Sequence, residues 1–369
     1  MGRRLKGEGL FRPFSRLLGH TQIPRTAFNL NSQGSAKNLT ASGSQAATIS
    51  VVIPTFRRPE MLQTLLYSLS KGSRIPDEVI VVDNDPKRSA YPEDIDGLNV
   101  RIVHAGLGIS LAGARNAGWR STTSELCFLI DDDNVVEYDA VAALAEAALS
   151  SHAGLAGPVI FAGDSDKIWC AGIIRSPWTG QTRCILGGES SAPADSVWDT
   201  DDMPDAFMVP RSILEKLDGF DEKTFPIHYD ESDFTARIRS LGLHNIVVGG
   251  SRVRHYGWVG TSPGSAMVRA ASSHGTDRVH QMVLSRFRFH VMHSRGLQRA
   301  STVGLFLPIW VVLAAVGCLN ADASWQIRLT TARAVGSGAL AGYREIFEHR
   351  MNRERGKHNG RKHLYGGSS

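Results

Sequence analysis

Three short stretches decide the fold class of this sequence: TISVVIPT at 48–55, DEVIVVDND at 77–85 and LCFLIDDDN at 126–134. Each is an apolar, largely β-branched run too short for a helix, which predicts a strand buried on both faces. Apolar residues at helical spacing follow the first run from Pro59, and an alanine-rich helical pattern follows the third. This alternation predicts an α/β protein with an open, mostly parallel sheet and helices on both faces.

Polar residues stand where these predicted strands end. They are Thr55, Asp83 and the triplet Asp131, Asp132 and Asp133. Ligands of open α/β sheets bind outside the carboxyl ends of the strands, so one pocket can collect these side chains. Three adjacent carboxylates repel one another, and a bound divalent cation removes that cost. Oxygen ligands suit Mg²⁺ or Mn²⁺, so we expect one of these ions here. A solvated acidic loop that caps the next helix is the alternative.

Two further stretches are candidates for nucleotide binding. PTFRRP at 54–59 places a hydroxyl and two cations, Arg57 among them, where they can meet a base and phosphates. A polar helix entry is the alternative there. GLGISLAGARNAG at 106–118 lacks the GxGxxG spacing, which makes a dinucleotide-binding loop a weak interpretation. Its Arg115 and Asn116 could still face a phosphate or a ribose from a helix.

A second acidic cluster, YDESDF at 229–234, holds Asp230, Glu231 and Asp233. Clustered acids raise one another's pKa, which suits a general base that works near neutral pH. The alternative is an acidic first helical turn, with Asp233 paired to Arg237. His255 ends a later predicted strand, and a lone histidine is more often structural. It becomes a metal ligand if the fold returns that strand to the first acidic cluster.

Composition and charge narrow the class of protein. The chain has 369 residues, of which 42% are hydrophobic and 21% charged, values that exclude collagen-like and wholly disordered proteins. Four cysteines without a CxxC pair exclude a disulfide scaffold and a zinc finger, and fit a reduced, cytoplasmic setting. Residues 1–47 and 342–369 each carry seven basic residues, against one and three acids. Basic tails beside an acidic body suit anionic lipid headgroups, with a merely solubilising tail as the alternative.

In their order along the chain, these motifs resemble the family 2 glycosyltransferases, which have the GT-A nucleotide-sugar-binding fold. The stretches that carry the resemblance are VVIPTFRRPEMLQTLLYSL, VIVVDND, GISLAGARNAGWR, FLIDDDNVV, FMVPRSILEKLDGFDE, YDESDFTARIRSLG and VRHYG. The resemblance implies a Rossmann-like open mixed sheet flanked by helices. It also implies metal-dependent, inverting transfer of a sugar from a nucleotide-sugar to a glycan or lipid-linked acceptor.

The resemblance assigns roles to individual residues. Donor-binding positions fall on Thr55, Arg57, Asp83, Arg115, Asn116, Asp131 and Asp132, and metal-binding positions on Asp131, Asp133 and His255. The catalytic base falls on Glu231, where the family usually has Asp, so Asp230 stays open as the base. Asp233 falls on the acceptor side. A Q-x-x-R-W motif, found in the processive synthases of the family, is absent, which favours a single addition.

Two other functions compete with this interpretation. A nucleotidyltransferase has a similar sheet and acidic metal site but needs a Gly-rich, Lys-bearing signature after the first strand, which PTFRRPE lacks. A non-catalytic glycan- or partner-binding module on the same scaffold is favoured by the exchange of Asp for Glu231. The intact acidic triplet and His255 weigh against it, because a binding module does not need a metal site.

The resemblance and the composition together predict four regions. They are a basic, mostly disordered segment over 1–47, the GT-A domain over 48–262, a helical region over 263–341 and a basic tail over 342–369. The charge-free stretch 301–321 is long enough to cross a hydrocarbon core of about 30 Å. A spanning helix and a buried or shallowly embedded helix pair both stay open. Arginines are more frequent before it than after it, so we expect a cytoplasmic protein on the inner face of the cell membrane. Because the basic charge lies in the tails, we expect no nucleic-acid partner.

Overall fold

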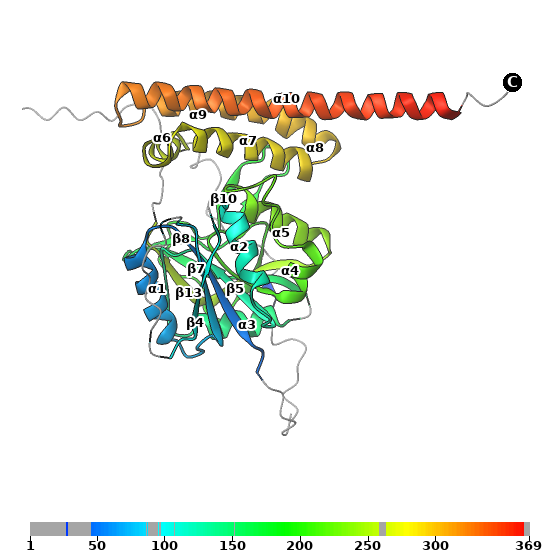
Figure 1. Cartoon of the computed structure of the whole chain (residues 1–369). Helices are drawn as coiled ribbons and strands as arrows, with labels where there is room; N and C mark the ends of the chain where they lie inside the picture. Colours follow the sequence, from blue (N-terminus) through cyan, green and yellow to red (C-terminus); the bar gives the residue numbers. More distant parts are fainter. Residues whose placement is uncertain are drawn as a thin grey trace, which may run out of the picture.

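The computed structural model describes residues 27–28, 46–85, 87, 95, 97–106, 108–150, 152–257 and 263–364, and side chains as far as residue 348. It has two parts. Residues 46–257 form a domain built on one large sheet, here called the sheet domain, and residues 263–364 form a layer of helices, here called the helical layer. Figure 1 shows the helical layer across one end of the sheet domain, with the longest helix along its outer side.

The first half of the sheet is parallel, as the sequence predicts. Its strands lie in the order β5-β2-β3-β4 and run in one direction. The strands are β2 (Ile49–Thr55), β3 (Glu78–Asp83), β4 (Val100–His104) and β5 (Leu126–Ile130). The helices between and after them are α1 (Pro59–Ser70), α2 (Leu111–Arg120) and α3 (Ala140–Ala148). The carboxyl ends of β2, β3 and β5 therefore meet at one edge.

The second half of the sheet is mixed. β12 (Ala206–Pro210) lies antiparallel between β5 and β7 (Ala153–Ala162), and β13 (His244–His255) lies parallel to β7. Beyond β13, the antiparallel β11 (Val197–Thr200) carries β1 (Ala27–Phe28). β6 (Asn134–Val136) and β8 (Ile168–Cys170) pair with β13 and β7. β1 comes from the segment predicted to be disordered, and the rest of residues 1–45 lies outside the described part.

Side chains of the central strands alternate between two cores. Ile49, Val51 and Ile53 of β2 pack with α1 and α3 on one face, whereas Val52 packs with the other helices on the opposite face. The other helices are α2, α4 (Arg211–Leu217) and α5 (Asp230–Ser240). Because every face of the central strands is covered, the site can only form at their ends.

The helical layer has its own apolar core. Its helices are α6 (Pro263–His274), α7 (Thr276–His293), α8 (Gly296–Ser301), the π-helical turn η2 (Thr302–Phe306), α9 (Leu307–Leu319) and α10 (Trp325–Leu364). Val283, Phe287, Leu307 and Val335 are among its buried residues. α10 runs across the expected boundary between the helical region and the basic tail at residue 342.

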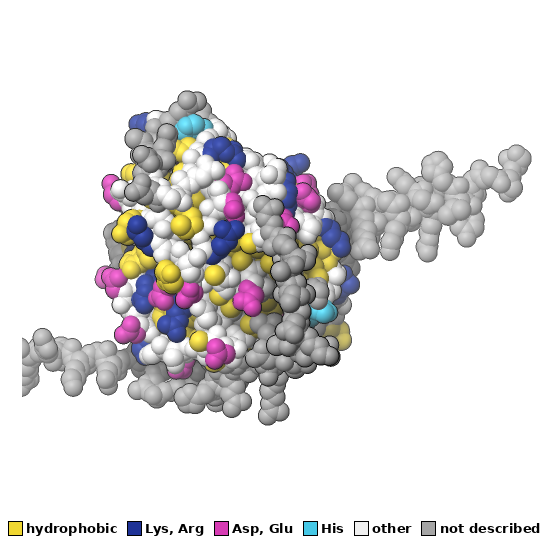
Figure 2. Space-filling view, turned by 90° about the horizontal axis from the view of Figure 1, so that it is seen from below, with side chains coloured by type: hydrophobic (Ala, Val, Ile, Leu, Met, Phe, Trp, Pro, Cys, Tyr) yellow, Lys and Arg dark blue, Asp and Glu magenta, His cyan; other side chains and the backbone are white. Residues whose placement is uncertain are grey.

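A hairpin of the sheet domain reaches into this layer. It consists of β9 (Ile173–Arg175) and β10 (Thr182–Cys184), and Figure 1 shows it next to α7 and α8. The hydroxyl of Thr302 donates to the carbonyl of Trp178 at 3.1 Å, and Arg286 Nη2 donates to the carbonyl of Gly180 at 3.1 Å. The opposite face of the sheet domain carries acidic, basic and apolar side chains interspersed (Figure 2).

Candidate active site

The three side chains of the acidic triplet after β5 are divided between two arginines. The hydroxyl of Thr55, at the end of β2, donates to Asp132 Oδ2 at 2.7 Å. Arg58 Nη1 donates to Asp132 Oδ1 and to Asp133 Oδ2, each at 3.0 Å. Asp131 turns toward α2 and binds Arg115. The triplet is therefore neutralised from two sides, and Asp131 and Asp133 do not face one common point.

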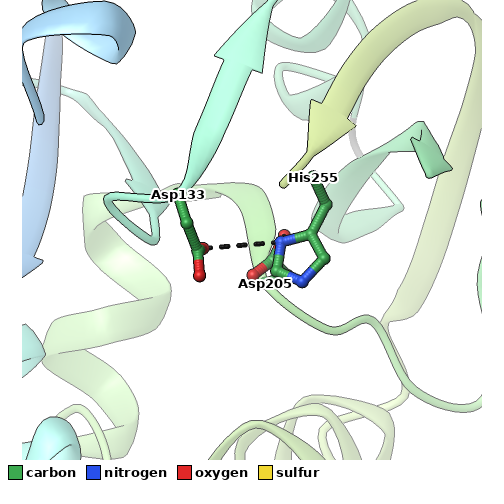
Figure 3. Close-up of side chains that lie close together, drawn as sticks. All are labelled: Asp133, Asp205 and His255. Carbon is green, nitrogen blue, oxygen red and sulfur yellow. Dashed lines mark ion pairs between the residues drawn. The ribbon is translucent and has the colours of Figure 1, made fainter. Parts of the chain in front are cut away.

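Asp133 meets two residues that come from other strands (Figure 3). His255 Nδ1, at the end of β13, lies 3.4 Å from Asp133 Oδ1 and 3.2 Å from Asp205 Oδ2. One ligand atom from each of Asp133, Asp205 and His255 lies within 4.8 Å of the others. This is a donor set that a divalent cation can bind. Asp205 takes the place that the sequence interpretation gave to Asp131.

Three features of this trio fit a bound cation. Asp205 Oδ2 and His255 Nδ1 are buried, and neither makes a hydrogen bond among the described residues. A Cβ atom on Gly257 would lie 2.3 Å from His255 Nε2 and 2.9 Å from Asp133 Oδ2, so only glycine leaves the ring and carboxylate in place. Trp169 stacks on the His255 ring at 4.6 Å between centroids and fixes its orientation.

The protonation of His255 follows from these neighbours. Burial disfavours the imidazolium, but contacts with Asp133 and Asp205 outweigh burial and raise the pKa of His255 to about 10. When no metal ion is bound, a proton on this ring balances the carboxylates together with Arg58. A divalent ion would replace that proton, because a metal-binding histidine must be neutral.

Arg115 joins the two acidic clusters. This α2 side chain is 1% exposed, and it binds one carboxylate of the triplet and two of the first turn of α5. Its Nη1 lies 2.5 Å from Asp230 Oδ2, and its Nη2 lies 2.8 Å from Asp131 Oδ1 and 2.6 Å from Glu231 Oε1. The acids at 131–133 and those near 231 are thus joined through one buried guanidinium.

Glu231 and Asp230 have different surroundings. Glu231 lines a cavity of about 320 Å³, whereas Asp230 does not and is 2% exposed. Glu231 also accepts the backbone N–H of Asp205 at 2.9 Å. Burial raises the pKa of Glu231 well above its usual value, Arg115 opposes this rise, and Asp230 and Asp131 add to it. Burial likewise raises the pKa of Asp131 to about 7.

The edge formed by β2 and β3 holds the remaining nucleotide-binding candidates. Asp83 accepts the backbone N–H of Asp85 at 2.8 Å and lies 3.2 Å from His104 Nδ1. Arg57, in a left-handed backbone conformation, donates from Nε to Asp85 Oδ1 at 3.0 Å. These polar groups lie beside Thr55, since Thr55 and Asp83 are partners in neighbouring strands.

Two predicted site residues have structural partners. Asn116 donates to the carbonyl of Phe220 at 2.8 Å and accepts its N–H at 2.9 Å, so its amide ties α2 to the loop after α4. Asp233 is fully buried and binds Arg237 Nε at 2.7 Å, as the helical alternative predicts, and His293 Nε2 at 2.8 Å. It connects α5 to α7.

The sequence reasoning missed Asp205 and Arg58. Asp205 precedes β12, which is antiparallel, so its amino end meets the carboxyl ends of the parallel strands. A search of carboxyl ends cannot find such a residue. Arg58 stood in the PTFRRP stretch, but nothing in its pattern separated it from Arg57.

Comparison with known proteins supports the glycosyltransferase class that the sequence motifs, the fold and the site indicate. Residues 50–218 match the model of glycosyl transferase family 2, and this part of the chain belongs to that family. A curated relative, the uncharacterized glycosyltransferase YwdF of Bacillus subtilis (strain 168), is 32% identical over 91 residues. That match covers 23% of this chain, and the chain spans about a third of the length of the relative. The matched domain is a glycosyltransferase domain.

Two solved structures have a similar chain path. One is GalNAc-T7 with UDP, GalNAc and Mn²⁺, with a TM-score of 0.48 and 16% identity over 69% of this chain and 56% of that chain. The other is the mannosyltransferase PcManGT from Pyrobaculum calidifontis in complex with GDP-Man and Mn²⁺, with a TM-score of 0.49 and 16% identity. It covers 81% of this chain and 88% of that chain. The family assignment rests on the sequence match.

Proposed function

We propose that this protein transfers one sugar from a nucleotide-sugar donor to a hydroxyl group of a glycan or lipid-linked acceptor, with inversion. The observation that carries the proposal is the double contact of Asp205. Its carboxylate lies 3.2 Å from His255 in the candidate metal site, and its backbone N–H donates to Glu231 at the cavity. One residue thus holds the candidate metal site next to the candidate base.

The donor would lie along the ends of β2, β3 and β5. Thr55, Arg57 and Asp83 would contact the nucleotide, with Asp131 and Asp132 at the ribose side. Arg115 would not bind the donor, because three carboxylates already bind its guanidinium. Its role is to hold these acids in place.

Asp133, Asp205 and His255 would hold Mn²⁺ or Mg²⁺. When bound there, the ion supplies charge neutralisation to the departing nucleoside diphosphate. The two carboxylates and the imidazole are ligands that fit Mn²⁺ and, with more bound water, Mg²⁺. Trp169 would orient the ring of His255 by stacking on it. Gly257 would leave free the space beside this ring that a side chain would fill.

Glu231 would act as the general base. It faces the cavity, and its raised pKa makes it a stronger proton acceptor than an exposed carboxylate. It would take the proton from the acceptor hydroxyl as that oxygen attacks the anomeric carbon. Attack opposite the diphosphate inverts the anomeric configuration. Asp230, buried against Arg115, would position this pair.

A panel of nucleotide-sugars tests this function. With Mn²⁺ or Mg²⁺, one donor should release nucleoside diphosphate and raise the melting temperature. Glu231→Gln should lower turnover more than 100-fold and keep donor binding, whereas Glu222→Gln, which changes a contact of Asn116, should stay within a few-fold of wild type. Donor binding without turnover by the wild type would favour a binding module, and wild-type turnover in EDTA would contradict the metal role.

We further propose that the protein is cytoplasmic and associates with the inner face of the cell membrane through α9. Residues Gly296–Leu319 are long and apolar enough to cross a membrane, by length and composition only, with 28% of the most apolar window buried. One side of α9 packs into the core of the layer through Leu307, Ala314 and Cys318. The other side exposes Ile309, Val312, Leu313 and Val316, and Leu305 of the preceding η2 is exposed as well. A helix packed on one side and apolar on the other favours an orientation in the plane of the bilayer over a spanning one.

A further inference from the structure

The cavity beside Glu231 contains a cation that no carboxylate neutralises. Its walls come from the sheet domain and from α6, α7 and α9 of the helical layer, and two acids and Arg286 are its charged residues. Glu231 is bound by Arg115 and Asp202 is bound by Arg175 at 2.7 Å. Arg286 has no acidic partner among the described residues, and its hydrogen bonds go to a hydroxyl and a carbonyl. Arg286 is therefore the cation of this cavity that is left for an anionic ligand.

Arg286 is held in one position by neutral groups only. Its Nη1 donates to the Tyr229 hydroxyl at 3.1 Å, its Nη2 donates to the Gly180 carbonyl at 3.1 Å, and its guanidinium lies 4.3 Å from the Trp310 ring centroid. A guanidinium has five N–H donors. In Arg286 the Nε–H is buried and has no partner among the described residues. The fork is thus fixed in place with donors to spare, which suits a carboxylate or phosphate.

A second residue that lines the same cavity has an unpartnered nitrogen. His228 Nε2 is buried and makes no hydrogen bond among the described residues. Burial, together with Arg278 and His274, lowers the pKa of His228 to about 3, so the ring is neutral at physiological pH. A neutral imidazole nitrogen can exchange a hydrogen bond with a sugar hydroxyl. Buried polar atoms without partners are costly, and a bound ligand would satisfy both of them.

We propose that this cavity binds an acceptor sugar that carries an anionic group, held by Arg286, with a hydroxyl near His228 and another at Glu231. The proposal rests on the proposed function, because it makes this cavity the acceptor site of that transferase. The anionic group is a carboxylate on the ring or a phosphate attached to it. Both present the planar or forked oxygen pairs that a guanidinium recognises.

Binding of small glycosides to the full-length chain tests the proposal. The probes are methyl β-glucuronide, methyl β-glucoside 6-phosphate and the neutral methyl β-glucoside, titrated by calorimetry. One or both anionic probes should bind at least tenfold more tightly than the neutral probe, and the tighter one identifies the source of the charge. Equal binding of all three probes to the wild type would overturn the proposal.

Two charge-removing variants locate the site. Arg286→Gln should reduce binding of the anionic probes at least tenfold and leave the neutral probe unchanged. Arg299→Gln removes an equal charge from α8, outside the cavity, and should stay within twofold of wild type. Equal losses in the two variants would show unspecific attraction and contradict the proposal. If Arg286→Gln does not fold, Arg286→Lys, which keeps the charge, should retain the anionic preference, and its loss would contradict the proposal.

A separate measurement keeps this inference apart from the proposed function. Binding of nucleotide with Mn²⁺ depends on the trio Asp133, Asp205 and His255, and Arg286→Gln should leave it unchanged. Nucleotide binding without anionic preference would sink the acceptor proposal alone. Anionic preference without any nucleotide binding or turnover would sink the transferase and keep the cavity as a binding site.

Discussion

At the scale of single residues, the charge balance of the site depends on Arg115. It is nearly fully buried, and it holds the carboxylates of Asp131, Asp230 and Glu231 within 2.5–2.8 Å. Burial disfavours its charge, but these carboxylates outweigh burial and raise its pKa well above the usual value. Because the partners come from the end of β5 and from the first turn of α5, the contacts of this one side chain fix the distance between the two acidic clusters.

Replacement of Arg115 should therefore destabilise the whole protein. Arg115→Met leaves buried carboxylates unpaired, and we expect a loss of about 3–5 kcal/mol in the free energy of unfolding, measured with urea. Arg115→Lys should recover little, since an ammonium cannot reproduce the fork. Arg120→Met, on the exposed side of the same helix, should cost less than about 1 kcal/mol. Similar losses at both positions would show that Arg115 is not the central charge.

Gly257 supplies the clearest test of the metal site. Gly257→Ala puts a methyl group 2.3 Å from His255 Nε2, so the ring must move from its place beside Asp133. We expect the Mn²⁺-dependent rise in melting temperature to disappear and turnover to fall more than 100-fold, with the fold retained. Gly336→Ala, in α10 with nothing within 4 Å of the added Cβ, is the matched control and should keep both properties. An unchanged Mn²⁺ response in Gly257→Ala would place the ion elsewhere.

At the scale of elements, the sequence predicts best where strands are parallel and buried. The runs at 48–55, 77–85 and 126–130 became β2, β3 and β5, because continuous apolar β-branched runs have few other stable environments. Nothing in the sequence of the antiparallel β12 indicated that its amino end belongs to the site. Asp205, which directly precedes this strand, was therefore missed. The orientation of Asp131 toward Arg115 could not be predicted from the sequence either. It depends on the packing between α2 and α5, which are far apart in the chain.

The exposed side of α9 should bind to a lipid surface. Val312 and Leu313 are each 61% exposed, and burial of two such side chains in lipid stabilises binding by more than 1.4 kcal/mol, or tenfold. Val312→Glu with Leu313→Glu should reduce flotation with anionic vesicles at least tenfold.

The control for α9 lies on the sheet domain. Tyr138 and Leu149 are 65% and 59% exposed, so Tyr138→Glu with Leu149→Glu adds the same charges to an equally exposed apolar pair. This variant should float like the wild type. Full release of the wild type by alkaline carbonate is expected of an in-plane helix, and resistance to it would favour a spanning one.

At the scale of the whole molecule, the helical layer and the sheet domain complete one another. Asp233 of α5 binds His293 of α7, Tyr229 before α5 binds Arg286 of α7, and the cavity has walls from both parts. The first turn of α5 carries the candidate base, so the helical layer fixes the position of Glu231. The sequence alone placed a helical region after residue 263 but gave no sign that it forms a wall of the site.

Acid should weaken this junction, and His290 makes the effect measurable. His290 is 1% exposed and packs against Gly180, where a Cβ would lie 2.5 Å from the ring. Burial, with Arg286 and Arg175, lowers its pKa to about 3, against 6.5 for a free histidine. The unfolded chain therefore binds a proton at this position between pH 6.5 and 3, and the folded chain does not. Its contribution to stability is fully present above pH 6.5 and is lost as the pH falls toward 3.

The loss should reach about 2 kcal/mol at pH 5, at 1.4 kcal/mol for each pH unit below 6.5. His290→Gln cannot take up the proton, so its free energy of unfolding should fall less than that of the wild type between pH 7 and 5, by about that amount. His280→Gln changes another histidine of α7, whose ring contacts the hydroxyl of Ser337 in α10, and it should follow the wild-type pH dependence. Parallel curves for the wild type and His290→Gln would show that His290 takes up its proton within the folded protein and does not make this junction sensitive to acid.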